Sequence, residues 1–126
     1  MAQKYIIGDL IKYKVGGLEF IAEITNTSKY GYCFKGVSDD ISGTLCKEFA
    51  KDIPLTTSIL EKNGWKKFKR PYSSDYCYRQ KGYPTLNIRS KNEVYFHWGD
   101  HDKSITTVHW LQHLLFGLGL NSEIEV

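Results

Sequence analysis

The sequence predicts an α+β fold, and three observations lead to this prediction. Short β-rich segments separated by turn residues fill most of 1–54. Similar segments, joined by connections of only a few residues, fill most of 65–108 and are typical of an antiparallel meander. Helical signals occur at 55–64 and 107–119. We therefore expect one domain, 1–126, whose sheets and helices share one core.

The first half, 1–54, should form a small SH3-like barrel or curled antiparallel sheet, because several short strands follow one another closely. Gly16-Gly17 lies between two β-rich runs and predicts a tight hairpin, since both central positions of such a turn need positive φ. The expected strands are Asp9–Val15, Leu18–Thr25, Tyr32–Lys35 and one or two short ones within Ile41–Phe49.

A short helix is expected within 55–64. Thr56 is a candidate N-cap, and Ser58 with Glu61 three residues later forms an alternative capping box half a turn further on. Gly64 suits the left-handed position after the helix. The segment therefore predicts a helix of about two turns.

The second half, 65–108, should be an antiparallel meander followed by a helix at 107–119. Thr107 is a candidate N-cap, and the tail after Gly119 is a candidate edge strand. Leucines at helical spacing predict an apolar stripe that packs on a sheet: Leu111, Leu114, Leu115 and Leu118. The expected strands are Tyr76–Arg79, Thr85–Ile88, Val94–Trp98 and Ile105–Val108.

Composition points to an ordinary globular chain, with 41% hydrophobic and 25% charged residues. Gly8 and Asp9 interrupt the apolar run at the N-terminus, so we expect no signal peptide and no membrane association. The three cysteines lack C-x-x-C spacing, which predicts reduced thiols rather than disulfides or a thiolate zinc site. These features favour a cytoplasmic protein.

Positive charge is concentrated between Lys62 and Lys91. This basic segment holds nine basic residues and one acidic residue, whereas the rest of the chain has a net charge of −5. Aromatic residues alternate with the cations, a composition that suits binding to phosphates and bases. A solvated sheet face with aromatics turned into the core, or a basic protein-binding face, would have the same composition. The candidate ligand-binding residues are Trp65, Lys66, Lys67, Lys69, Arg70, Tyr72, Arg79 and Lys81.

Four histidines form two pairs with a spacing of four, His97 with His101 and His109 with His113. The second pair would lie on one face of the C-terminal helix, a spacing that helical metal sites use. A His/Asp metal site would form if Asp100 or Asp102 converged on that pair. The alternative is that His109 donates to a backbone carbonyl and His113 is exposed.

Catalytic signatures are lacking in the sequence. Its serines have no G-x-S-x-G elbow, no cysteine lies in a known Cys-His signature, and Gly16-Gly17 precedes a strand rather than a phosphate-binding helix. We therefore expect a non-catalytic protein without a cofactor. Its oligomeric state is not predictable from these features.

Three stretches of the chain form a recognisable pattern: Ile7–Ile11; Ile53–Trp65, with Ile-Pro-Leu-Thr ahead of Ile-Leu-Glu-Lys-x-Gly-Trp; and Val108–Glu125, with Val-His-x-Leu-Gln-x-Leu-x-Phe and a later Glu-Ile-Glu. Together they resemble a family of uncharacterised small proteins from phages and prophages of Bacteroidetes-type bacteria. His109 and Gln112 match the family pattern, so with His113 they form a second candidate site. Trp110 and His113 depart from it.

The resemblance implies a mobile-element accessory protein in the cytoplasm of a bacterial host. In that setting we expect a binding protein that engages a host macromolecule or an anionic ligand, nucleotide or nucleic acid, and counters host defence. The alternatives are an RNA- or single-stranded-DNA-binding module, a nucleotide-sequestering protein and a His/Asp metal-binding protein.

Overall fold

The computed structural model describes residues 4–38, 40–69, 71, 76–89, 93–98 and 101–126. The chain divides into two compact units, Met1–Ile53 and Pro54–Val126. The first unit consists of strands and a 3₁₀ turn, and the second combines strands with two helices, so the chain has the predicted α+β fold. None of the helices in the described residues is long and apolar enough to span a membrane.

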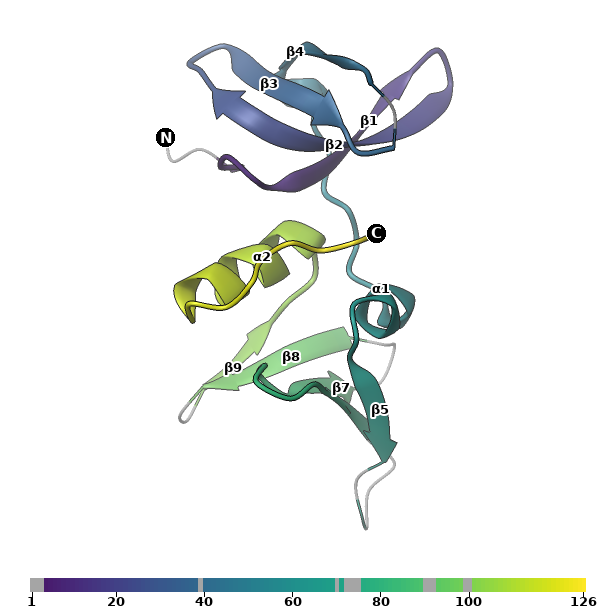
Figure 1. Cartoon of the computed structure of the whole chain (residues 1–126), viewed down its shortest axis with the longest axis vertical. Helices are drawn as coiled ribbons and strands as arrows, with labels where there is room; N and C mark the ends of the chain where they lie inside the picture. The colour runs from purple at the N-terminus through teal and green to yellow at the C-terminus, as the bar shows by residue number, and fades with distance from the viewer. Residues whose placement is uncertain (1–3, 39, 70, 72–75, 90–92, 99–100) are drawn as a thin grey trace. The chain divides into compact units, whose positions relative to one another are not determined.

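The first unit is a four-stranded antiparallel sheet with the strand order β1-β2-β3-β4 (Figure 1). The strands are β1 (Leu10–Val15), β2 (Leu18–Thr27), β3 (Gly31–Gly36) and β4 (Ser42–Cys46), and a 3₁₀ turn, Lys47–Phe49, follows β4. After this turn the chain returns to β1, where Lys12 and Lys51 exchange backbone hydrogen bonds of 3.0 and 2.9 Å. The sheet thus curls on itself as expected for an SH3-like unit.

The hairpin between β1 and β2 forms at the predicted glycines. Gly16 and Gly17 have φ of +58° and +83°, and Val15 pairs directly with Leu18. Aromatic rings fill the interior of the curled sheet: Tyr13 lies 4.8 Å from Phe34, measured between ring centroids. The core of this unit consists of Tyr5, Ile11, Tyr13, Ala22, Ile24, Tyr32, Phe34 and Ala50.

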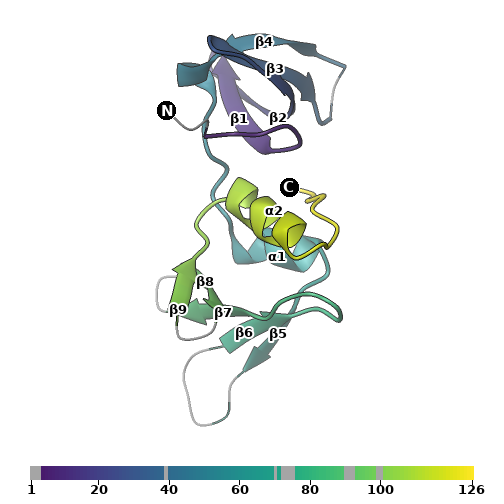
Figure 2. The same ribbon diagram turned by 90° about the vertical axis from the view of Figure 1, so that its left-hand side faces the viewer.

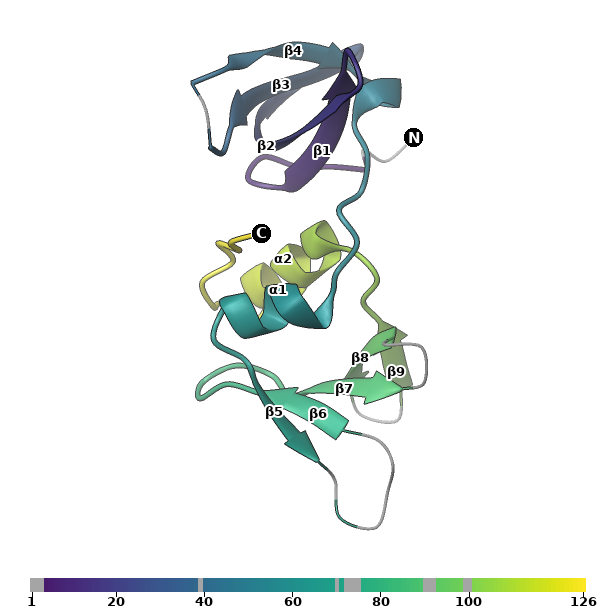
Figure 3. The same ribbon diagram turned by 90° about the vertical axis from the view of Figure 1, so that its right-hand side faces the viewer.

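The second unit combines a five-stranded antiparallel meander, order β5-β6-β7-β8-β9, with two helices. The elements are α1 (Thr57–Lys62), β5 (Lys66–Lys69), β6 (Tyr76–Arg79), β7 (Leu86–Arg89), β8 (Glu93–Trp98), β9 (His101–Ser104) and α2 (Val108–Gly117). Both helices lie over the same face of this sheet in Figure 2 and Figure 3.

Both predicted helix caps are confirmed. The Thr56 side chain accepts a hydrogen bond from the Ile59 backbone amide, and Thr107 accepts one from Trp110. The alternative capping box at Ser58 is not used, because the helix has already begun at Thr57. Each cap satisfies a backbone amide that has no partner inside its own helix.

Four expectations need correction. β5 was not predicted, and the last strand of the meander is His101–Ser104 rather than Ile105–Val108. The tail forms no strand: Asn63 holds it by donating to the Glu125 carbonyl at 2.7 Å and accepting from the Glu125 amide at 2.8 Å. Of the leucine stripe on α2, Leu111 and Leu115 are fully buried, whereas Leu118 is exposed.

Candidate functional site

The strand pairing of β5 with β6 divides the basic segment between two faces of the sheet. Directly paired residues lie on the same face, and successive residues alternate between faces. Lys66 pairs with Arg79, and these two lie on one face. Lys67 and Lys69 lie on the other face, since each is displaced from Lys66 by an odd number of residues. The cations of this segment therefore do not form one surface.

Lys67 and Lys69 lie on the side of the sheet that the helices cover at β6, β7 and β8, but both lysines are exposed on the edge strand β5. The row Tyr78, Leu86 and Phe96 runs across β6, β7 and β8 on this face, and all three side chains are buried. The Tyr78 hydroxyl donates to Glu61 of α1 at 2.8 Å, which joins this face to the helix. Burial, together with the hydrogen bond to Glu61, raises the pKa of Tyr78 to about 12.

The opposite side of the sheet, here called the outer face, holds a row of residues that crosses all five strands. Phe68 pairs with Cys77, Cys77 with Asn87, Asn87 with Tyr95, and Tyr95 with Ser104. Lys66 and Arg79 form the neighbouring row on the same face. Among the residues whose side chains the structure describes, the outer face consists of Lys66, Phe68, Cys77, Arg79, Asn87, Glu93, Tyr95 and Ser104.

Aromatic surface on the outer face is accessible at two places. Phe68 is 46% exposed, and Tyr95 is half-buried. The Arg79 guanidinium lies 5.3 Å from the centroid of the Phe68 ring, in the range of a cation–π contact. The Tyr95 hydroxyl donates to Glu93 at 2.6 Å. Cys77, in the same row, is buried.

The lysines and arginine of β5 and β6 carry uncompensated charge. Lys66, Lys67, Lys69 and Arg79 are all exposed, and within the described part of the chain none of them has an acidic side chain at ion-pair distance. Of these four cations, Lys66 and Arg79 lie beside the aromatic row. The described part of the outer face therefore combines accessible rings with two cations, Lys66 and Arg79, and one carboxylate, that of Glu93 beside Tyr95.

Trp65 cannot serve as a ligand-binding residue, contrary to our prediction. Its side chain is 2% exposed, its indole N–H donates to the Pro84 carbonyl at 3.3 Å, and its ring contacts Tyr83. Lys81 is exposed, in a turn after β6. Arg70 and Tyr72 were also candidates and lie outside the described residues.

Sequence reasoning did not include Phe68, Asn87 or Tyr95 among the candidate residues. The available signal was the alternation of side chains between the two faces of a strand. Phe68 is two positions after Lys66 and therefore shares its face. Tyr95 lies between Val94 and Phe96, which are buried under the helices, and therefore faces the other way. This pattern gives the face of a residue within one strand. Which strands pair, and in which register, is information that the pattern does not contain.

The second candidate site on α2 has a structural explanation. His109 is buried, and its Nδ1 lies 3.0 Å from the Thr107 hydroxyl oxygen. Gln112 is buried and donates to the Ser122 carbonyl at 3.3 Å, which holds the C-terminal tail. His113 is half-buried rather than exposed, with its ring 5.6 Å from that of His109.

The His/Asp metal-site hypothesis gains no support from the described residues, where no group of three His, Cys, Asp or Glu side chains could hold an ion. His97 and His101 belong to β8 and β9, and their side chains are outside the part of the chain that the structure describes. Asp100 lies outside the described residues. The three cysteines are free thiols.

Searches with the chain found no matching protein-family model, no matching curated protein and no matching solved structure.

Proposed function

We propose that this protein is a non-catalytic binder of single-stranded nucleic acid, RNA or DNA, and that it binds through the outer face of the β5–β9 sheet. The observation that carries the proposal is the row containing Phe68 and Tyr95, with Lys66 and Arg79 beside it on the same face. Rings stack on bases, and cations neutralise phosphates, so the two rows supply both halves of the interaction.

The geometry supports binding across the sheet rather than along one strand. Phe68 on β5 and Tyr95 on β8 are three strand positions apart. With adjacent strands about 4.8 Å apart, their backbones are separated by roughly 14 Å. A bound single strand that stacks on both rings therefore crosses β6 and β7, and the Lys66–Arg79 pair lies beside its path.

Recognition of this kind is tolerant of sequence. Base stacking on an aromatic ring contributes about 1–3 kcal/mol per base, and every base has a planar face. Few side chains in the described row could form hydrogen bonds that distinguish one base from another. They are the amide of Asn87 and the hydroxyl groups of Tyr95 and Ser104. We expect weak preference among sequences and a strong dependence of affinity on salt.

An alternative explanation covers part of the charge. β5 is an edge strand, and lysines on an edge strand prevent pairing with another chain. This accounts for Lys67 and Lys69 without any ligand. It does not account for the exposed Phe68 beside Lys66 and Arg79.

The resemblance to phage proteins gives this proposal its biological setting. In a bacterial host, a protein of this kind would bind single-stranded nucleic acid of the phage or of the host in the cytoplasm. By covering such strands it would keep host defence factors from them. Both the setting and the role in counter-defence are proposed on the resemblance alone.

The proposal is tested by fluorescence anisotropy with a labelled twelve-nucleotide RNA and the matching single-stranded and duplex DNA. We expect saturable binding to the single strands and much weaker binding to the duplex. Phe68→Ala should weaken binding about tenfold, the equivalent of roughly 1.4 kcal/mol for one stacked base. Lys69→Ala, on the same strand but the other face, is the matched control. Equal losses for the two variants, or no binding at low salt, would reject the outer face as the site.

A further inference from the structure

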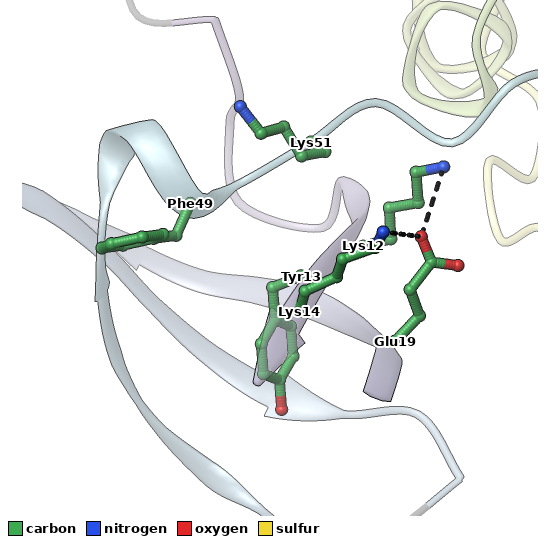
Figure 4. A pocket seen from close by; sticks show the side chains of 6 residues that line it. All are labelled: Lys12, Tyr13, Lys14, Glu19, Phe49 and Lys51. Carbon is green, nitrogen blue, oxygen red and sulfur yellow. Dashed lines mark ion pairs between the residues drawn. The ribbon is translucent and has the colours of Figure 1, made fainter. Parts of the chain in front are cut away.

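The first unit contains a separate basic hollow, here called the barrel groove. Its volume is about 380 Å³, and it is lined by Lys12, Tyr13, Lys14, Glu19, Phe49 and Lys51 (Figure 4). This volume lies at the lower end of the range for small-molecule sites. None of these residues belongs to the second unit, so the barrel groove and the outer face are independent.

Backbone pairing brings the lysines of the barrel groove together from distant parts of the sequence. Lys12 on β1 pairs with Lys51, which follows the 3₁₀ turn, and Lys14 pairs with Glu19 on β2. Because Lys12 and Lys14 are two residues apart, their side chains lie on the same face of β1. Four charged groups therefore line one side of the curled sheet.

The charge balance in the barrel groove is positive. Glu19 Oε1 lies 3.9 Å from the ammonium nitrogens of both Lys12 and Lys14, so one carboxylate is shared by two cations. Among the described residues, Lys51 has no acidic side chain at ion-pair distance, and in Figure 4 its side chain extends away from Glu19. Three ammonium groups and one carboxylate leave a net charge of +2.

An aromatic ring also lines the barrel groove. Phe49, in the 3₁₀ turn, is 56% exposed although it is large and apolar. Tyr13 is buried and forms part of the wall. An exposed ring next to a cluster of cations can stack on a planar group while the cations neutralise an attached anion.

We infer that the barrel groove binds a small phosphorylated molecule with a planar ring, of the mononucleotide class. The ring would stack on Phe49, and the phosphates would lie among Lys12, Lys14 and Lys51. The Glu19 carboxylate would repel the phosphates. When the ligand binds, the ion pairs of Glu19 with Lys12 and Lys14 would weaken. This inference does not rest on the proposed binding of nucleic acid by the second unit.

Isothermal titration calorimetry of the full chain tests the inference with three probes: ATP, adenosine and tripolyphosphate. ATP has both ring and charge, adenosine only the ring, and tripolyphosphate only the charge. We expect ATP to bind at one site, with both other probes at least about tenfold weaker, since each lacks one type of contact. Equal affinity for ATP and tripolyphosphate would overturn the role of the ring, and no ATP binding would overturn the inference.

Variants then locate the site. Lys51→Ala and Phe49→Ala should each weaken ATP binding about threefold to tenfold, as expected for one partly exposed charge or ring contact. Glu19→Gln should strengthen it, because it removes the one negative charge of the barrel groove. Lys35→Ala removes an exposed lysine elsewhere in the same unit and should have no effect. If Lys66→Ala abolishes ATP binding while Lys51→Ala does not, the ligand lies on the second unit and the inference is wrong.

Discussion

The variant Lys66→Ala gives the most quantitative test of whether the outer face binds the phosphates of a nucleic acid. Lys66 is exposed, lies on the same face as Arg79 and has no acidic partner in the described residues. Removing it should therefore delete one phosphate contact without disturbing a folded interaction. The variant should fold normally and bind more weakly.

The magnitude follows from counterion release. For single strands, each neutralised phosphate contributes about −0.7 to the slope of log affinity against log salt concentration. If Lys66 and Arg79 each neutralise one phosphate, the slope is about −1.4, and affinity falls about sevenfold between 50 and 200 mM salt. Lys66→Ala should halve the slope, so that the fall over the same range is only about 2.6-fold.

The assay is anisotropy of a labelled twelve-nucleotide single strand at four salt concentrations from 50 to 200 mM. Lys69→Ala is the control, since Lys69 is an exposed lysine on the same strand and the opposite face. Its slope should remain close to that of the wild-type protein. Equal slopes for the wild type and Lys66→Ala, or an equal change in Lys69→Ala, would refute contact between phosphates and the outer face.

Three further predictions concern stability and are read from urea unfolding. Because burial and Glu61 raise the pKa of Tyr78 to about 12 from 10.0, its contribution to stability is complete below pH 10 and is lost as pH rises through 12. The advantage of the wild type over Tyr78→Phe should therefore shrink by about 2–3 kcal/mol between pH 9 and 12. Gly31→Ala should destabilise the first unit by about 1–3 kcal/mol or more, since a Cβ there would clash with the Leu45 backbone carbonyl. Thr107→Ala should cost about 1 kcal/mol through loss of the α2 cap.

Each of these has its own control. Gly43→Ala adds a Cβ that would meet only the Phe34 ring at 3.7 Å, so it should be tolerated; equal losses at the two glycines would contradict the steric argument. Thr107→Ser keeps the capping oxygen and should retain most of the stability. An advantage of the wild type over Tyr78→Phe that is constant with pH would show that the Tyr78 pKa is not raised in the folded state.

Local signals predicted the parts of the fold that depend on neighbouring residues. Thr56 and Thr107 cap helices, and Gly16-Gly17 forms the hairpin, because capping and positive φ are decided within a few residues. β5 was missed because all four of its side chains are exposed, so the strand has no alternation of apolar and polar residues. β9 was missed for a related reason: His101–Ser104 contains no apolar residue.

The candidate site was predicted only in part. Its residue types can be read from one stretch of sequence, whereas its geometry depends on pairing between strands that are distant in the sequence. The sequence identified the cations and rings of the basic segment, but alternation along β5 separates Lys66 from Lys67, and Trp65 lies in the interior. Tyr95 joins the site from a strand more than twenty residues away in the sequence. Such pairings depend on tertiary structure, which no window of neighbouring residues contains.

The most direct test of the central claim is a two-dimensional ¹H–¹⁵N NMR titration of the full chain with a twelve-nucleotide single-stranded RNA. The proposal predicts that the largest shift changes occur at Phe68, Arg79, Asn87 and Tyr95, with small changes at helix-facing residues such as Leu86. Shift changes confined to the first unit or to α2, or an unchanged spectrum at saturating RNA, would contradict the outer face as the binding surface.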